Sequence, residues 1–176
     1  ADYRIKTSVV QASSPTDLVL VGGGDPLLRT TPAAPDESPA ASLTDLADQT
    51  ANALKAAASS GGETPTTLSA TVNFDDSLFT GPRTAPSWPS SYVTSKLVSP
   101  ITALMVNGGG GADPARTAAT TFVSLLKKRG IAVPAAPSRV TASSGATEVA
   151  AVNSSALSGV VTHTLTASDN TAAEML

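Results

Sequence analysis

Two helical segments that carry their own start signals constrain this fold most strongly. Residues 42–58 open with a capping box formed by Ser42 and Asp45, and apolar residues then recur at helical spacing. Residues 114–129 begin with the proline of the pair Asp113-Pro114, in which the aspartate can cap the helix and the proline suits its first turn. A further apolar stripe over residues 155–165 predicts a third helix near the C-terminus.

Runs of β-branched and apolar residues alternate with these helices and predict strands. They are residues 3–10, 17–21, 66–76 and 101–107, together with the short runs 131–133 and 138–142. A Pro-rich stretch over 80–91 predicts a loop, and four glycines at 108–111 predict a flexible joint. This order of elements predicts an α+β or mixed α/β fold.

Composition excludes several classes of function. Aromatic residues make up only 3% of the chain, so the core must consist mainly of Ala, Val, Leu and Ile. The chain has no cysteine and one histidine, which excludes disulfides, thiolate zinc sites and histidine-rich metal sites. A net charge of −3 without a long basic run gives no reason to expect a nucleic-acid partner. We therefore predict no metal, no cofactor and no transmembrane segment in this chain, since its apolar runs are too short for one.

Three local patterns resemble functional motifs but fit other roles better. The stretch "GGGDPLL" lacks the spacing of a dinucleotide or phosphate loop and predicts a tight turn, although nucleotide binding stays open as an alternative. Ser124 and Lys127 satisfy Ser-x-x-Lys, but they fall late in a helix, with the serine turned away from the apolar stripe. Lys6-Thr7-Ser8 lies within a predicted strand, and His163, without acidic neighbours at helical spacing, is expected on a helix face.

The tripeptide Ser168-Asp169-Asn170 is the strongest chemical signal. Serine acyl-transferases that react with penicillin combine Ser-x-x-Lys, Ser-Asp-Asn and Lys-Thr-Gly elements. Alone, however, three such polar residues can equally cap a short helix.

The order of segments along almost the whole chain resembles the class C low-molecular-mass penicillin-binding proteins, which are serine D-alanyl-D-alanine carboxypeptidase/endopeptidases. The stretches that carry the resemblance are "YRIKTSVV", "DLVLVGGGDPLL", "LTDLADQTANAL", "VNFDDSLFTGP", "SWPSSY", "VSPITALMVNGG", "DPARTAATTFVSLLKKRGIAV" and "NSSALSGVVTHTLTASDNTAAEML". The resemblance implies that residues 1–150 form an α+β insertion domain between the Ser-x-x-Lys and Ser-Asp-Asn elements. Residues 151–176 would then be part of the helical region of a β-lactamase-like catalytic domain.

The resemblance also implies roles for individual residues. Ser168 would relay a proton to the departing D-alanine, and the Asn170 amide would hold the substrate carbonyl. Asp169 would fix the loop, while Trp88 and Tyr92 would line the cleft, unless they form only a small loop core. The implied partners are a peptidoglycan stem peptide, β-lactams as inhibitors, and the remainder of the catalytic domain.

The nucleophile and the Lys-Thr-Gly element of that family have no credible counterpart in these 176 residues. The expected activity, acyl transfer outside the cytoplasm in the cell envelope, therefore belongs to a longer protein or to a complex. The alternative is a non-catalytic, cell-wall-associated module with the same fold.

Overall fold

The computed structural model describes residues 3–35, 37–60 and 67–176. Its main sheet has four strands in the order β4-β2-β1-β6. The strands are β1 (Arg4–Gln11), β2 (Asp17–Val21), β4 (Thr71–Asp75) and β6 (Glu148–Ala156). β1 is antiparallel to β2 and to β6, whereas β2 and β4 are parallel. A separate parallel pair joins β3 (Leu68–Ser69) to β5 (Ile131–Ala132).

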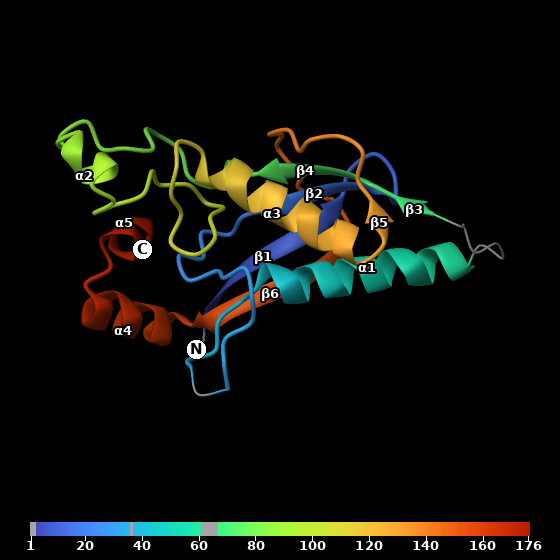
Figure 1. Ribbon diagram of the computed structural model, residues 1–176, viewed down its shortest axis with the longest axis horizontal. Coiled ribbons are helices and arrows are strands. Elements are labelled where there is room, and N and C mark those ends of the chain that lie inside the picture. Colours follow the sequence, from blue (N-terminus) through green and yellow to red (C-terminus); the bar gives the residue numbers. More distant parts are fainter. Residues whose placement is uncertain (1–2, 36, 61–66) are drawn as a thin grey trace.

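Two long helices cover one face of the main sheet. α1 (Leu43–Ser60) connects β2 to its parallel neighbour β4, and α3 (Pro114–Lys128) packs beside α1 and against β4 (Figure 1). The three remaining helices are α2 (Ser91–Thr94), α4 (Leu157–Ala167) and α5 (Asn170–Met175). These short helices lie together at one end of the molecule, beyond the end of β6 (Figure 1). The α+β class is confirmed.

The start signals act as the sequence predicts. The Ser42 hydroxyl accepts from the backbone N–H of Asp45 at 3.0 Å and donates to the Asp45 carboxylate at 2.7 Å. The Asp113 carboxylate accepts from the backbone N–H of Arg116 at 3.2 Å, and Pro114 occupies the first turn of α3. Each cap satisfies a backbone donor that the helix itself leaves free.

The core between sheet and helices is mostly aliphatic, as the composition predicts. Phe74 and Phe122 are its largest fully buried side chains, and the others are mainly Leu, Val, Ile and Ala. β1 alternates between exposed and buried residues from Arg4 to Thr7, and Ser8 and Val9 are then both buried. None of the helices in the described ranges is long and apolar enough to cross a membrane.

The predicted strand at 101–107 is wrong. Residues 102–106 are buried but irregular, and the carbonyl of Ala103 accepts from the backbone N–H of Gly24 at 2.8 Å. A side chain on Gly22 would overlap Ala103 and Leu104, so this approach of two chains requires glycine. The run is apolar because it is buried on all sides, which sequence periodicity does not distinguish from a strand.

Two further expectations about strands need correction. Residues 138–142 form no strand, and only Arg139 makes an isolated bridge, to Phe74. In contrast, β6 was not predicted, because its Ala- and Ser-rich sequence has low β propensity and the strand depends on pairing with β1. Residues 150 and 151, where we place the boundary between the two predicted domains, both lie inside β6.

Candidate active-site loop

The tripeptide Ser168-Asp169-Asn170 connects α4 to α5; we call it the interhelical loop. Ser168 takes the left-handed conformation (φ 52°, ψ 43°) that ends α4, and the N–H of Asp169 donates back to the carbonyl of Thr164 at 3.1 Å. The Asp169 carboxylate then caps α5 by accepting from the N–H of Ala172 at 2.9 Å. Ser168 and Asn170 are exposed on either side of the half-buried Asp169.

The segment that carries Trp88 and Tyr92 lies against this loop. Residues 83–101, here called the aromatic loop, close on themselves through a hydrogen bond from the N–H of Ile101 to the carbonyl of Arg83 at 2.7 Å. The side-chain amide of Asn170 donates to the carbonyl of Leu97 at 3.2 Å. The structure therefore brings together two candidate regions that are more than seventy residues apart in the sequence. Trp88 is half-buried, and Tyr92 is 42% exposed.

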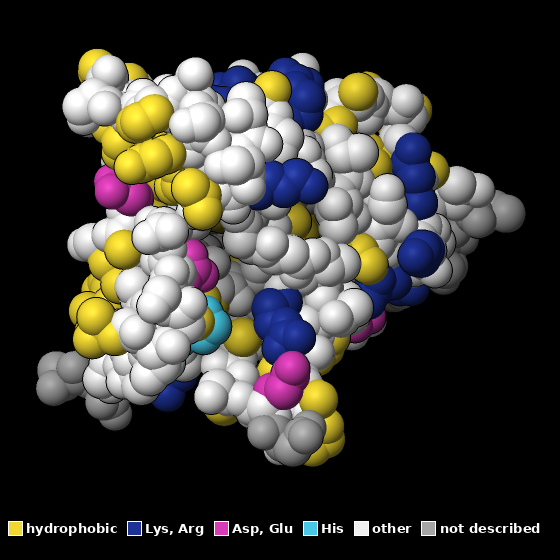
Figure 2. Space-filling model, turned by 60° about the vertical axis from the view of Figure 1, so that its left-hand side comes forward, with side chains coloured by type: hydrophobic (Ala, Val, Ile, Leu, Met, Phe, Trp, Pro, Cys, Tyr) yellow, Lys and Arg dark blue, Asp and Glu magenta, His cyan; other side chains and the backbone are white. Residues whose placement is uncertain are grey.

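A groove of about 1060 Å³ borders the interhelical loop on the side of α4. Asp169 and His163 line it together with residues of the 26–29 and 37–40 segments, and Figure 2 shows the single histidine beside a hollow. His163 lies on the exposed face of α4, as predicted, and its Nε2 is 3.7 Å from the Asp169 carboxylate. Asp169 thus caps α5 and lies near the single histidine.

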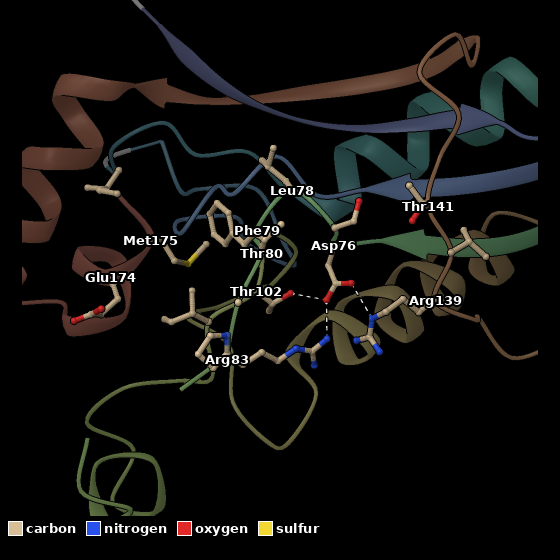
Figure 3. Close-up of a pocket in the computed structure, with 16 residues that line it drawn as sticks. Asp76, Leu78, Phe79, Thr80, Arg83, Thr102, Arg139, Thr141, Glu174 and Met175 are labelled. Atoms are coloured by element: carbon tan, nitrogen blue, oxygen red, sulfur yellow. Dashed lines mark hydrogen bonds and ion pairs between the residues drawn. The ribbon is translucent and has the colours of Figure 1, made fainter. Parts of the chain in front are cut away.

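A second cavity, of about 720 Å³, lies at the other end of α5. Asp76 is buried in its wall and accepts from Arg83 at 3.0 Å, from Arg139 at 2.8 Å and from the Thr102 hydroxyl at 2.8 Å (Figure 3). Met175 of α5 lies beside Phe79 on the facing wall (Figure 3). Neither this cavity nor the groove includes Ser168 or Asn170 in its lining, although Asp169 lines the groove and Glu174 and Met175 of α5 line the cavity.

The sequence did not indicate the Asp76 cluster. Asp113 joins it, since its carboxylate accepts from Arg83 at 3.2 Å and from Arg139 at 2.7 Å. Although burial alone would raise the pKa of Asp113, hydrogen bonds from the Arg116 backbone and Arg139 hold it below its usual value. Two adjacent acidic residues at the end of the predicted strand 66–76 were the available signal, but nothing local identified their partners.

The structure agrees with the rejection of the other motifs. Ser124 is exposed and donates to the carbonyl of Thr120 within α3, and Lys127 is exposed in the last turn. Lys6, Thr7 and Ser8 lie within β1. In the described ranges, no group of three or more His, Asp or Glu residues could hold a metal ion.

The "GGGDPLL" stretch forms the predicted turn and buries a carboxyl group. Asp25 is only 2% exposed; one of its oxygens accepts from the N–H of Leu27 at 2.9 Å, and the other has no hydrogen-bond partner in the described part of the chain. Burial raises the pKa of Asp25 to about 6, and the Leu27 hydrogen bond only partly opposes this. The folded state therefore retains a proton that the unfolded chain releases at lower pH.

This buried carboxyl predicts a change of stability with pH. Because the pKa is raised in the folded state, the contribution of the protonated Asp25 carboxyl to stability is complete below pH 3.8. This contribution is lost as the pH rises through about 6. We compare the unfolding free energy of Asp25→Asn with that of wild type at two pH values. We expect the difference in favour of the variant to increase by about 2 kcal/mol from pH 4 to pH 7. Urea unfolding at both pH values measures this, with Glu174→Gln, which alters an exposed carboxyl, as the control. An equal difference at both pH values would contradict the prediction.

Comparison with known proteins covers the chain from end to end. The family model described as D-Ala-D-Ala carboxypeptidase 3 (S13) matches residues 1–112 and 110–176. The chain is also 32% identical, over 183 aligned residues, to a protein of Mycobacterium tuberculosis (strain ATCC 25618 / H37Rv) named carboxypeptidase Rv3627c. The alignment covers 98% of this chain but only 37% of that relative.

Proposed function

Since the chain belongs to the D-Ala-D-Ala carboxypeptidase 3 (S13) family, we propose that it is the central part of a serine-type D-Ala-D-Ala carboxypeptidase. Its substrate would be the stem peptide of peptidoglycan, and the enzyme would work outside the cytoplasm, where that polymer is found. The observation that carries the proposal is the interhelical loop itself. It presents two exposed side chains two residues apart, the Ser168 hydroxyl and the Asn170 amide, and the amide is hydrogen-bonded to the loop that carries Trp88 and Tyr92.

In this mechanism a serine outside the chain attacks the carbonyl carbon of the penultimate D-alanine while a lysine accepts its proton. The peptide bond to the terminal D-alanine breaks, and the departing amine takes up a proton through the Ser168 hydroxyl. Water then hydrolyses the acyl-enzyme and regenerates the serine. A β-lactam would acylate the same serine and act as an inhibitor.

In that scheme the residues of this chain bind the substrate and orient the reacting groups. Asn170 uses one N–H of its amide on the Leu97 carbonyl, which leaves a second N–H and the amide oxygen for the substrate carbonyl and the lysine. Asp169 fixes the loop through the α5 cap rather than touching substrate. Trp88 and Tyr92 would provide apolar walls for the donor peptide on the same side.

Mass spectrometry with a labelled penicillin tests the proposal. We expect the intact protein to form one covalent penicilloyl adduct and the 176-residue chain to form none, because the chain lacks a credible nucleophile. If the intact protein forms no adduct, the non-catalytic wall-associated module is the better description. An adduct on Ser124 of the 176-residue chain would overturn the assignment of the motifs.

A further inference from the structure

We propose that Thr171 is a positioning residue that clamps the interhelical loop to the aromatic loop. This inference rests on the function proposed above. The Thr171 hydroxyl oxygen accepts a hydrogen bond from the backbone N–H of Ser99 at 3.0 Å. Both residues are buried, with exposures of 8% for Thr171 and 7% for Ser99. An N–H group buried to this extent needs a partner, and here the partner is a side chain 72 residues away.

The clamp lies directly beside the exposed chemical groups. Asn170 and Thr171 are consecutive, and they bind Leu97 and Ser99 of the aromatic loop, respectively. Asn170 is exposed and Leu97 is 54% exposed, so their hydrogen bond competes with water. The buried bond of Thr171 is therefore the one able to fix the register between the two loops, and the register decides where the Asn170 amide points.

Ser99 is itself held by a second segment of the chain. Its hydroxyl accepts from the backbone N–H of Gly110 at 2.9 Å. Gly109 approaches so closely that a Cβ there would lie 2.3 Å from the Ser99 hydroxyl oxygen, and its φ of 78° also favours glycine. The glycine stretch 108–111 thus contacts the Ser99 side chain, while Thr171 of α5 binds the Ser99 backbone N–H. In this part of the structure the stretch has a packing role, in addition to the joint that its composition predicts.

Removal of the Thr171 hydroxyl should loosen the clamp without changing side-chain volume. We expect Thr171→Val to lower the second-order rate constant for acylation of the intact protein by penicillin about 10-fold, because the Ser99 N–H loses its buried acceptor. Thr171→Ser keeps the hydroxyl and should stay within about 2-fold of wild type. Thr120→Val is the matched control, since Thr120 is exposed and its hydroxyl donates to the carbonyl of Arg116 in its own helix.

Trypsin cleavage gives a readout that does not depend on activity. Lys96 is exposed and immediately precedes Leu97, so the Lys96–Leu97 bond reports on attachment of the aromatic loop. In intact wild-type protein we expect cleavage there to be at least about 100-fold slower than in a free peptide of residues 92–101, because cleavage requires local opening. Thr171→Val should cleave about 10-fold faster than wild type, and Thr171→Ser should not.

Several results would overturn the inference. The first is that folded wild type is cleaved at Lys96 as fast as the free peptide. The second is that penicillin acylates Thr171→Val as fast as wild type, and the third is that it acylates Thr171→Ser as slowly as Thr171→Val. The first comparison needs no variant, so it can refute the clamp even if Thr171→Val does not fold. A wild type that forms no penicilloyl adduct would refute the proposed function, whereas the cleavage rates would still show whether the clamp exists.

Discussion

Intact protein that carries Asn170→Ala is expected to be acylated by penicillin about 100- to 1,000-fold more slowly than wild type. The substitution removes the only side-chain amide of the interhelical loop, and with it the group proposed to hold the substrate's amide carbonyl and to orient the lysine. Loss of a group that orients both substrate and base has an effect of about this size, because misplacement of reacting groups by about 1 Å can cost about 100-fold in rate. Stopped-flow measurement with a fluorescent penicillin gives the rate constant.

The control for this variant is Asn153→Ala. Asn153 is an exposed asparagine of β6, outside the interhelical loop and the aromatic loop, so its loss should leave acylation within about 2-fold of wild type. The expected loss for Asn170→Ala also exceeds that for Thr171→Val, because a positioning residue acts only through the group it holds. If Asn170→Ala is acylated within about 3-fold of wild type while its thermal unfolding is unchanged, Asn170 has no part in the reaction.

Asp76→Ala is expected to lower the unfolding free energy of the protein by about 3–4 kcal/mol. Asp76 is nearly buried and accepts three hydrogen bonds, two of them from arginines. Its loss leaves the buried hydroxyl of Thr102 without this acceptor and leaves two positive charges with Asp113 as their remaining acidic partner. Urea unfolding monitored by circular dichroism measures the change.

Asp48→Ala is the matched control for this cluster. Asp48 also pairs with an arginine, Arg129, but its side chain is 55% exposed, so the pair contributes less than about 1 kcal/mol. The contrast between the two aspartates tests whether burial, rather than ion pairing as such, determines the loss. Equal destabilisation by both substitutions would show that the Asp76 cluster is not an organising contact.

Local signals in the sequence were enough to place most elements. The capping box of α1, the Asp-Pro start of α3 and the apolar stripe of α4 each involve residues within one or two helical turns. The helix predictions succeeded because the interactions that carry them are complete within a few neighbouring residues. The roles of Ser168 and Asn170, taken from the tripeptide motif, and those of Trp88 and Tyr92, taken from the family resemblance, stay predictions.

Contacts between distant segments could not be predicted in this way. β6 exists through its pairing with β1, and the buried run 102–106 is irregular because it packs against the glycine turn. The acceptor for the Asn170 amide and the donor to the Thr171 hydroxyl are main-chain atoms of the aromatic loop, which leave no signature in the sequence. By itself the sequence determined the helices α1, α3 and α4, the strands β1 and β2, and the presence of the tripeptide. Only the tertiary structure decided what that tripeptide is held against, because main-chain partners depend on how the chain closes and not on residue type.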